Sequence, residues 1–461
     1  METRSLKFVA DACAGEIQRG VAETLADNVC TDSRSAKPGD VFFAIRGEKF
    51  DGHEFLIEVA AKGVAAVVVE KGKIPSPAPD CAVLVVDDVR AAFGKLAAAY
   101  RKDFGLPVIA VGGSNGKTTT KELLASVLRQ KFSTLGSEAS FNNDIGVPAT
   151  LLRLKKTHQV AVVEVGTNHP GELAPLVKLI APQFGVITNI GREHLEFFGD
   201  IVGVAQEEGW LAELLPADGK LFINGDNEWT EKIAMRTQAK IIRVGLGEKN
   251  DWRAKKVRLD KNGVTFQVDA PQKEFSGEYR VNLLGRHQVT NALLAIAVGG
   301  DFGLNREEIQ RGLADCQPLK MRLQFWEANG VRVLDDAYNA NADSTIAALE
   351  TLCDLPLQGR RVAVLGDMEE LGAHSATAHA EVGKRAAELG VGQLFAIGKM
   401  APVMAAAARQ AGLGRVIEFT DVEAATHAVK NFLKVGDVVL LKASRASRLE
   451  RLAEALKSEK S

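Results

Sequence analysis

The feature that most constrains this fold is a glycine-rich turn directly after an apolar run. Residues 108–111 read Val-Ile-Ala-Val, which is typical of a buried strand, and Gly-Gly-Ser-Asn-Gly-Lys-Thr-Thr-Thr follows. Apolar residues of the next segment recur at helical spacing, at Leu123, Leu124, Val127 and Leu128. The sequence therefore predicts a strand, a tight turn and a helix, which aim backbone N–H groups and the helix dipole at one point.

A turn of this kind suits a polyphosphate ligand. Lys117 would reach the terminal phosphates, and Thr118 has the hydroxyl that binds Mg²⁺ beside them. Val111 stands where the general nucleotide-binding loop has glycine, so this loop is shorter than that pattern. An ordinary glycine turn before a helix is the alternative, but the lysine and the threonines favour phosphate binding.

Length, charge and cysteine content set limits on the class of protein. A chain of 461 residues is too long for one core, so two to four domains are expected. The net charge of −2, spread over the chain, favours neither nucleic acid nor membranes as partners. Five cysteines without a C-x-x-C pair indicate a reducing compartment and no structural zinc. We find no signal peptide and no apolar stretch of transmembrane length, and we expect a cytoplasmic protein.

The order of apolar runs predicts three α/β domains. A helical pattern that ends near Arg101 is broken at 104–107, and a second break lies near Pro318. Between these breaks, apolar strands alternate with helical segments, which indicates a parallel sheet. The predicted central strands are 108–111, 160–165, 184–188 and 221–223. An alternating stretch over 257–281 then indicates an antiparallel patch, and a helix is expected over 289–299.

The region after Pro318 begins another α/β series. Its predicted strands are 331–334, 361–365, 394–397, 416–419 and 438–441. This region contains no G-x-G-x-x-G, so a nicotinamide cofactor bound as in dehydrogenases is not expected. We predict domain boundaries at 1–104, 105–316 and 317–461.

Two strands of the central region end in groups that could bind metal. The strand 160–164 ends in Glu164, and 184–191 is followed by Arg192, Glu193 and His194. The carboxyl ends of parallel strands meet at one edge of a sheet, where ligands bind. A carboxylate suits Mg²⁺, and a neutral imidazole could complete the shell of a second metal. A solvated carboxylate and a loop histidine bonded to backbone are the alternatives, but the convergence with Thr118 favours metals.

Other polar clusters lie in segments typical of turns. They are Asn142–Asn143, Asn168–His169, 335–341 and 366–370. Each precedes a helical pattern, so helix capping is the simpler interpretation of each one taken alone.

The motifs, taken in order, resemble those of the Mur ligases, the ATP-dependent amide-bond ligases of bacterial cell-wall synthesis. The motifs at 32–34, 39–42 and 51–55 resemble a uridine-nucleotide domain, and those at 113–119, 142–148, 164–169 and 188–196 resemble the central ATPase. The motifs at 334–341, 365–372 and 442–445 resemble the C-terminal domain. Tyr-Asn-Ala-Asn at 338–341 and Gly-Asp-Met-Glu-Glu-Leu-Gly at 366–372 are most similar to the branch that adds D-alanyl-D-alanine.

The resemblance implies a fold and a reaction. The fold would be α/β, with a small N-terminal uridine-nucleotide domain, a central P-loop ATPase with a mostly parallel sheet and a C-terminal Rossmann-like domain. ATP, with Mg²⁺, would phosphorylate the carboxylate of UDP-N-acetylmuramoyl-tripeptide, and the amine of D-alanyl-D-alanine would displace the phosphate. We expect a monomer without nucleic-acid partners or membrane insertion. A ligase that adds the third residue, a folylpolyglutamate synthase-like ligase and an idle nucleotide sensor remain alternatives.

The resemblance also assigns roles to residues. The nucleotide site would comprise Gly113, Ser114, Asn115, Gly116, Lys117, Thr118, Thr119, Asn291 at adenine, Arg322 at the phosphates and Asp336 at the ribose, with Tyr338, Asn339 and Asn341 beside them. The substrates would contact Ser33 and Arg34 (uridine diphosphate), Asn142 and Asn168 (sugar-peptide), and Lys442, Ser444 and Arg445 (dipeptide). Thr118 and Glu164 would bind the ATP-linked Mg²⁺, and His194 a second Mg²⁺. Because Arg322 and Asp336 lie beyond the second boundary, the third domain must close on the second to complete the site.

Glu208 marks a departure from the family pattern. Most of the family has a carbamylated lysine at the position where this chain has Glu208. A glutamate already presents two anionic oxygens, so we expect Glu208 to take the place of the carbamate at the second metal and the enzyme to be insensitive to bicarbonate. The expected catalytic residues are therefore Lys117, Glu164, His194 and Glu208. The alternative is a solvated helix face formed by Glu207 and Glu208.

Overall fold

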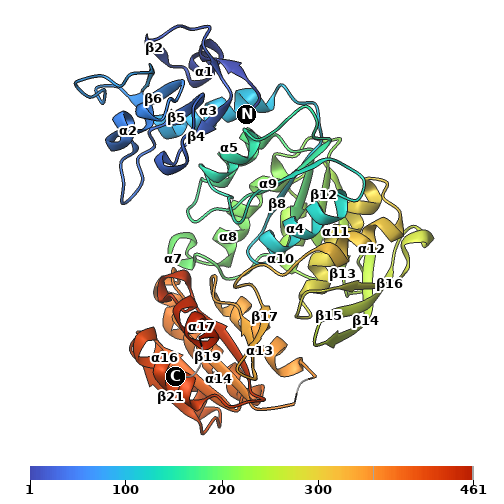
Figure 1. Ribbon diagram of the computed structural model, residues 1–461. Coiled ribbons are helices and arrows are strands. Elements are labelled where there is room, and N and C mark those ends of the chain that lie inside the picture. Colours follow the sequence, from blue (N-terminus) through green and yellow to red (C-terminus); the bar gives the residue numbers. More distant parts are fainter. Residues whose placement is uncertain (357, 459–461) are drawn as a thin grey trace.

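Three large sheets, one from each part of the chain, carry the fold, and a two-stranded antiparallel sheet accompanies the N-terminal one (Figure 1). The computed structural model describes residues 1–356 and 358–458. Residues 459–461, the end of the predicted third domain, and residue 357 lie outside the described residues. The predicted boundaries at 104/105 and 316/317 fall in the connections between the sheets.

The N-terminal sheet has five strands in the order β2-β7-β6-β5-β4, of which only β2 is antiparallel to its neighbour. The elements are β1 (Arg4–Ser5), α1 (Leu6–Cys13), β2 (Glu16–Arg19), β3 (Leu25–Ala26), β4 (Asn28–Cys30), β5 (Asp40–Phe43), α2 (Leu56–Ala61), β6 (Ala66–Glu70), β7 (Ala82–Val86) and α3 (Val89–Arg101). α3 also packs on α5 and α6 of the central domain. The Tyr100 hydroxyl donates to Leu154 O at 2.7 Å, and Arg101 Nε donates to Ile180 O at 3.1 Å. The first two domains therefore share a core, and the same buried apolar cluster extends into the C-terminal domain.

The central sheet has nine strands in the order β16-β15-β14-β13-β12-β11-β8-β10-β9. Its elements are β8 (Val108–Gly112), α4 (Lys117–Leu128), β9 (Thr134–Gly136), α5 (Gly146–Leu151), β10 (Val160–Glu164), α6 (Leu173–Ile180), β11 (Phe184–Ile187), α7 (Leu195–Phe198), α8 (Ile201–Glu208), α9 (Trp210–Glu213), β12 (Lys220–Asn224), α10 (Glu228–Ala234), β13 (Lys240–Gly245), β14 (Trp252–Asp260), β15 (Gly263–Asp269), β16 (Gly277–Val281), α11 (Gln288–Asp301) and α12 (Arg306–Asp315). The strands from β9 to β14 run parallel, and β14, β15 and β16 form the predicted antiparallel patch.

Helices cover both faces of this sheet, which explains the continuous apolar run of β8. α4 and α11 pack on one face, and α6 and α9 pack on the other. In the sheet, β8 lies between β11 and β10, and β9 lies on the other side of β10. After β8 the chain passes over β10 to form β9, and after β10 it passes over β8 in the opposite direction to form β11. The connections thus diverge around β8, and the carboxyl ends of β8, β10 and β11 border the crevice where open α/β sheets bind ligands.

The C-terminal sheet has six strands in the order β17-β18-β22-β19-β20-β21, and its elements are β17 (Gln324–Ala328), β18 (Val331–Asp335), α13 (Ala342–Asp354), β19 (Arg361–Leu365), α14 (Ser375–Glu388), β20 (Gln393–Ile397), α15 (Ala401–Gln410), β21 (Val416–Phe419), α16 (Val422–Phe432), β22 (Val438–Lys442) and α17 (Glu450–Lys457). β17 is antiparallel to β18, and the other strands are parallel. α13, α14 and α15 form one helical layer, and α16 and α17 form another. The predicted α/β fold with three domains is confirmed, but the sequence did not predict β9, β13 or β17.

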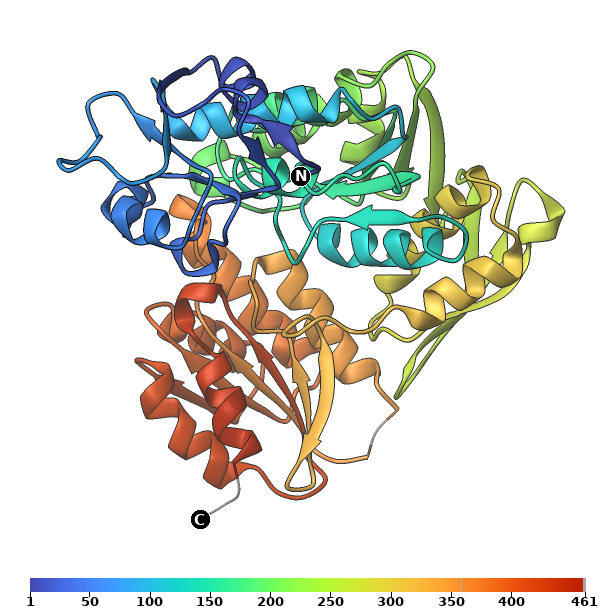
Figure 2. The same cartoon turned by 45° about the horizontal axis from the view of Figure 1, so that its top comes forward.

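Figure 2 shows the C-terminal domain (orange to red) below the N-terminal (blue) and central (cyan through green to yellow) domains. Within the described part of the chain, no helix combines the length and the apolar character that crossing a membrane would require.

Candidate active site

The glycine-rich turn lies between β8 and α4, as predicted. Gly113 and Gly116 have φ values of 108° and 85°, which side chains rarely tolerate. The residues after β11 hold the turn in place, since Ser114 N donates to Asn189 O at 2.8 Å and the Thr188 hydroxyl donates to Asn115 O at 2.7 Å. The positive end of the α4 dipole therefore faces the mouth of the crevice.

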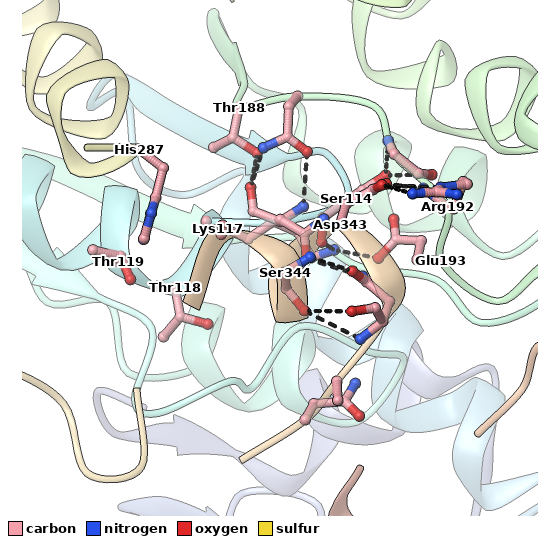
Figure 3. Close-up of a pocket in the computed structure, with 18 of the residues that line it drawn as sticks. Ser114, Lys117, Thr118, Thr119, Thr188, Arg192, Glu193, His287, Asp343 and Ser344 are labelled. Carbon is pink, nitrogen blue, oxygen red and sulfur yellow. Dashed lines mark hydrogen bonds and ion pairs between the residues drawn. The ribbon is translucent and has the colours of Figure 1, made fainter. Parts of the chain in front are cut away.

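Lys117, the first residue of α4, lies among carboxylates (Figure 3). Its ammonium donates to Gly113 O, to Ser114 O at 3.1 Å and to Glu193 Oε2 at 3.4 Å. Burial lowers the pKa of Lys117, but the charges of Glu193, Glu208 and Glu164 raise it further, so the net pKa lies above its ordinary value. The lysine is held as a cation beside the turn.

Glu208 is the last residue of α8, and its buried side chain contacts the turn. Its Oε2 accepts the Gly113 N–H at 2.7 Å, whereas its buried Oε1 has no hydrogen-bond partner within the described residues. Burial raises the pKa of this carboxyl to about 7, against the charge of Lys117, which lowers it. The alternative of a solvated helix face is wrong, because the Glu207 carboxylate is also buried and accepts the N–H groups of Gly171 and Leu173.

Glu164, the last residue of β10, meets Thr118, the second residue of α4, as predicted. The Thr118 hydroxyl donates to Glu164 Oε1 at 3.1 Å, and Asn142 Nδ2 donates to the same oxygen at 2.9 Å. Glu164 is 1% exposed, so it is not the solvated strand-end carboxylate of the alternative interpretation. Its Oε2 is buried without a hydrogen-bond partner among residues 1–356 and 358–458. A hydroxyl beside an unpartnered carboxylate oxygen fits the ligand preference of Mg²⁺.

His194 lies in the same crevice but is bound by the C-terminal domain. Its Nδ1 bonds to Glu370, and its Nε2 is 3.9 Å from Glu193 Oε2. The hydrogen bond from His194 holds the pKa of Glu370 below its ordinary value. In the described chain, no group of three or more histidine, cysteine, aspartate or glutamate residues is arranged to hold a metal ion. A second Mg²⁺ between His194 and Glu208 therefore stays a prediction.

The central and C-terminal domains together line a cavity of about 740 Å³. Seventeen of the predicted residues line it: Ser114, Asn115, Gly116, Lys117, Thr118, Thr119, Asn142, Glu164, Asn168, His194, Asn291, Arg322, Asp336, Tyr338, Asn339, Asn341 and Lys442. The cavity thus brings together residues that are far apart in the sequence.

At the cavity, residues of the C-terminal domain are in direct contact with the central domain. The Arg322 guanidinium lies 4.2 Å from the centre of the Tyr338 ring, and its Nη2 donates to Ser140 Oγ at 2.9 Å. Asp336 accepts the Leu323 N–H at 3.0 Å and forms an ion pair with Lys442, which is 3% exposed. Asn341 is the N-cap of α13, so the capping interpretation is right for this residue, and it also donates to Asn115 Oδ1 at 3.0 Å.

The remaining predicted substrate residues lie elsewhere. Asp32 and Ser35 line a second cavity of about 390 Å³ between the N-terminal and central domains, whereas the neighbouring Arg34 side chain is exposed and paired with Asp32. Ser33 is buried. Ser444 is buried and accepts the Glu369 N–H at 2.9 Å, and Arg445 is exposed, 3.6 Å from Glu450. The predicted contacts of these residues with substrates stay predictions.

Sequence reasoning gave no role to the charged residues that join the two domains. They are Arg192, Asp343, Glu370 and Glu381. Arg192 follows a strand of the parallel sheet, and this position is the one signal that the sequence offers for it. The residues that meet Arg192 and His194 come from α13, α14 and the loop after β19, whose proximity no local pattern reveals.

Comparisons with known proteins match the whole chain to one family. Residues 26–101 match the model described as "Mur ligase family, catalytic domain", 111–299 match "Mur ligase middle domain" and 321–445 match "Mur ligase, glutamate ligase domain". The UDP-N-acetylmuramoyl-tripeptide–D-alanyl-D-alanine ligase of Escherichia coli is 36% identical over 457 residues, which covers 98% of each chain.

Solved structures agree with this match. A crystal structure of MurF from Acinetobacter baumannii has a TM-score of 0.91 and 33% identity, with 100% of both chains covered. MurF from Thermotoga maritima in complex with ADP has a TM-score of 0.82 and 27% identity, covering 93% of this chain and 97% of that one.

Proposed function

This chain belongs to the Mur ligase family, and we propose that it joins D-alanyl-D-alanine to UDP-N-acetylmuramoyl-tripeptide with ATP. This reaction completes the nucleotide-linked pentapeptide precursor of peptidoglycan. The observation that most directly supports this proposal is the shared cavity. Lys117 and the turn line it from the central domain, and Arg322, Asp336 and Tyr338 line it from the C-terminal domain. The full-length similarity to ligases of this specificity favours it over the third-residue and folate alternatives. We place the reaction in the cytoplasm and expect a monomer.

The chemistry needs the tripeptide carboxylate to become a better acyl donor. One carboxylate oxygen attacks the γ-phosphorus of ATP, ADP leaves, and an acyl phosphate forms. The dipeptide amine then attacks the acyl carbon, inorganic phosphate leaves, and the amine loses a proton. Phosphoryl transfer of this kind depends on alignment and on neutralising charge at the phosphate oxygens.

The residues of the cavity can supply these functions. The Lys117 ammonium and the N–H groups of the turn would neutralise the phosphates of ATP, and Arg322 would do so from the opposite domain. Asp336 is positioned by the Leu323 N–H and Lys442 and would accept a hydrogen bond from the ribose. Asn291 is fixed by Thr120 and Gln288 and would contact adenine.

Thr118 and Glu164 would hold the Mg²⁺ that accompanies ATP, which supplies positive charge next to the transferred phosphoryl group. The buried unpartnered Glu164 Oε2, considered over the described residues, supports this assignment. We further propose that Glu208 takes the position of the family's carbamylated lysine, so that bicarbonate is not required.

A phosphate-release assay tests the function. Release of inorganic phosphate from ATP should require UDP-N-acetylmuramoyl-tripeptide and D-alanyl-D-alanine together, and Lys117→Ala should lower kcat/KM at least a hundredfold, because a charge-stabilising donor is lost. Arg385→Ala is the control, because Arg385 forms its ion pairs with Glu350 and Glu388 inside the C-terminal domain, and this variant should keep its activity. Phosphate release without the dipeptide, or an unaltered Lys117→Ala enzyme, would contradict the proposal.

A further inference from the structure

Arg192 joins the central domain to two helices of the C-terminal domain. Its backbone N–H donates to Asp343 Oδ2 at 2.8 Å, and its Nε and Nη2 donate to Asp343 Oδ1 at 2.9 and 2.5 Å. Its Nη1 and Nη2 also donate to the two carboxylate oxygens of Glu381 at 2.5 and 3.2 Å. Asp343 lies in the first turn of α13, and Glu381 lies on α14. One guanidinium therefore fixes two elements of the opposite domain.

The loop that carries Arg192 also contacts the glycine-rich turn. Gly191 N donates to Ser114 Oγ at 2.9 Å, and Glu193 contacts the Lys117 ammonium at 3.4 Å. Figure 3 shows Ser114, Lys117, Arg192, Glu193 and Asp343 around the same pocket. The position of α13 is thus coupled to the part of the protein that binds phosphate.

The fit between loop and helix is close. A Cβ on Gly191 would lie 2.7 Å from Asp343 Oδ2, closer than side-chain atoms normally approach. The carboxylate reaches the Arg192 backbone only because residue 191 is glycine. Asn341, the N-cap of the same helix, bonds to Asn115 of the turn, so two contacts hold this helix end.

We propose that Arg192 is a positioning residue that holds the C-terminal domain in the closed arrangement needed for ATP binding. The inference rests on the proposed function, because ATP is the ligand whose site closure completes. Four of the five N–H groups of the guanidinium point to carboxylates of the other domain, so they are not available to a phosphate. Arg192 acts on ATP through Arg322, Asp336 and Tyr338, which line the cavity only while their domain is docked.

Two measurements on the apoprotein and its nucleotide complex test the proposal. Small-angle X-ray scattering reports the radius of gyration, and calorimetry reports the Kd of a non-hydrolysable ATP analogue. In Arg192→Ala the open population should rise, so the radius of gyration increases and the analogue binds roughly fivefold or more weakly. The control Arg385→Ala removes a guanidinium that also pairs with two carboxylates, Glu350 and Glu388, but within the C-terminal domain. It should match the wild type in both measurements.

A double-mutant cycle separates positioning from other effects. Glu381→Ala should weaken analogue binding in the same direction, and Arg192→Ala/Glu381→Ala should be no weaker than Arg192→Ala alone, since the two residues act through one contact. Gly191→Ala, which displaces Asp343 and leaves the guanidinium present, should also open the protein. If Arg192→Ala does not fold, Glu381→Ala and Gly191→Ala test the proposal in its place.

Weaker analogue binding by Arg192→Ala with an unchanged radius of gyration would overturn the proposal and indicate a direct phosphate contact. Unchanged binding and an unchanged radius would overturn it as well. Neither result depends on ligase activity, so a wild-type protein that fails to make the amide would contradict the proposed function and leave this test valid.

Discussion

At the scale of single residues, Glu208 is a side chain whose negative charge is disfavoured by its burial. It is 1% exposed, one of its oxygens accepts the Gly113 N–H, and Lys117 is the nearby positive charge that offsets its burial. Burying such a group lowers the stability of the folded protein. Strongly perturbed carboxyl groups gather at functional sites, and the position of Glu208 beside the glycine-rich turn agrees with a role in the reaction.

The raised pKa of Glu208 gives a prediction for stability. Because its folded-state pKa is about 7 instead of the ordinary 4.5, the folded protein binds more protons than the unfolded chain between these values. Wild-type stability should therefore decline through this group as the pH rises from about 4.5 to about 7. Glu208→Gln keeps an acceptor for Gly113 and does not titrate, so its stability should change less over that range.

Urea unfolding of both proteins with a chelator present, at several pH values, measures this difference. A constant offset would reflect only the altered hydrogen bonding of glutamine, so the slope against pH is the quantity compared. Parallel slopes would show that Glu208 is ionised at ordinary pH in the folded protein.

At the scale of elements, two helices begin with the same capping box but differ in where they lie. Asn305 caps α12 with Glu308, and Asn341 caps α13 with Ser344. Replacing either asparagine by alanine should cost about 1 kcal/mol of stability, because each leaves an N–H at the helix start without its acceptor. Only Asn341→Ala should also weaken binding of the ATP analogue, because Asn341 bonds to Asn115 of the turn.

Thermal unfolding and calorimetry on the pair give this comparison, with Asn305→Ala as the matched control. Equal effects on analogue binding would mean that the Asn341–Asn115 contact has no part in positioning α13.

Element patterns also explain how much the sequence could predict. Strands β8, β10, β11 and β22 are buried on both faces, so their apolar runs are visible without a structure. β9 has three residues, too few to leave a periodic pattern, and β17 is a half-buried edge strand. The turn, Thr118 and Glu164 could be placed because they lie at or just beyond the carboxyl ends of β8 and β10, which are neighbours in one sheet. The Arg192–Glu381 contact could not, because it depends on how two separate sheets dock.

At the scale of the whole molecule, the contacts between the domains differ in kind. The N-terminal and central domains pack on each other through α3. The buried apolar cluster that they share also includes residues of the C-terminal domain. Ion pairs such as Arg192–Asp343 and His194–Glu370 add charged contacts between the central and C-terminal domains. Because these ion pairs cross between the two domains, we expect salt to modulate the closure of the C-terminal domain.

Ionic strength supplies the corresponding prediction. The side chains of Arg192 and Asp343 are each 35% exposed, so salt reaches their ion pair. The screening length falls from about 10 Å at 0.1 M to about 3 Å at 1 M ionic strength, which weakens partly exposed pairs. Analogue binding weakens with salt in any phosphate site, so the informative quantity is the ratio of Kd between Arg192→Ala and wild type. This ratio should shrink as salt increases, whereas the ratio for Arg385→Ala should stay near one. A ratio for Arg192→Ala that is independent of salt would mean that packing and uncharged hydrogen bonds, instead of these ion pairs, hold the domains closed.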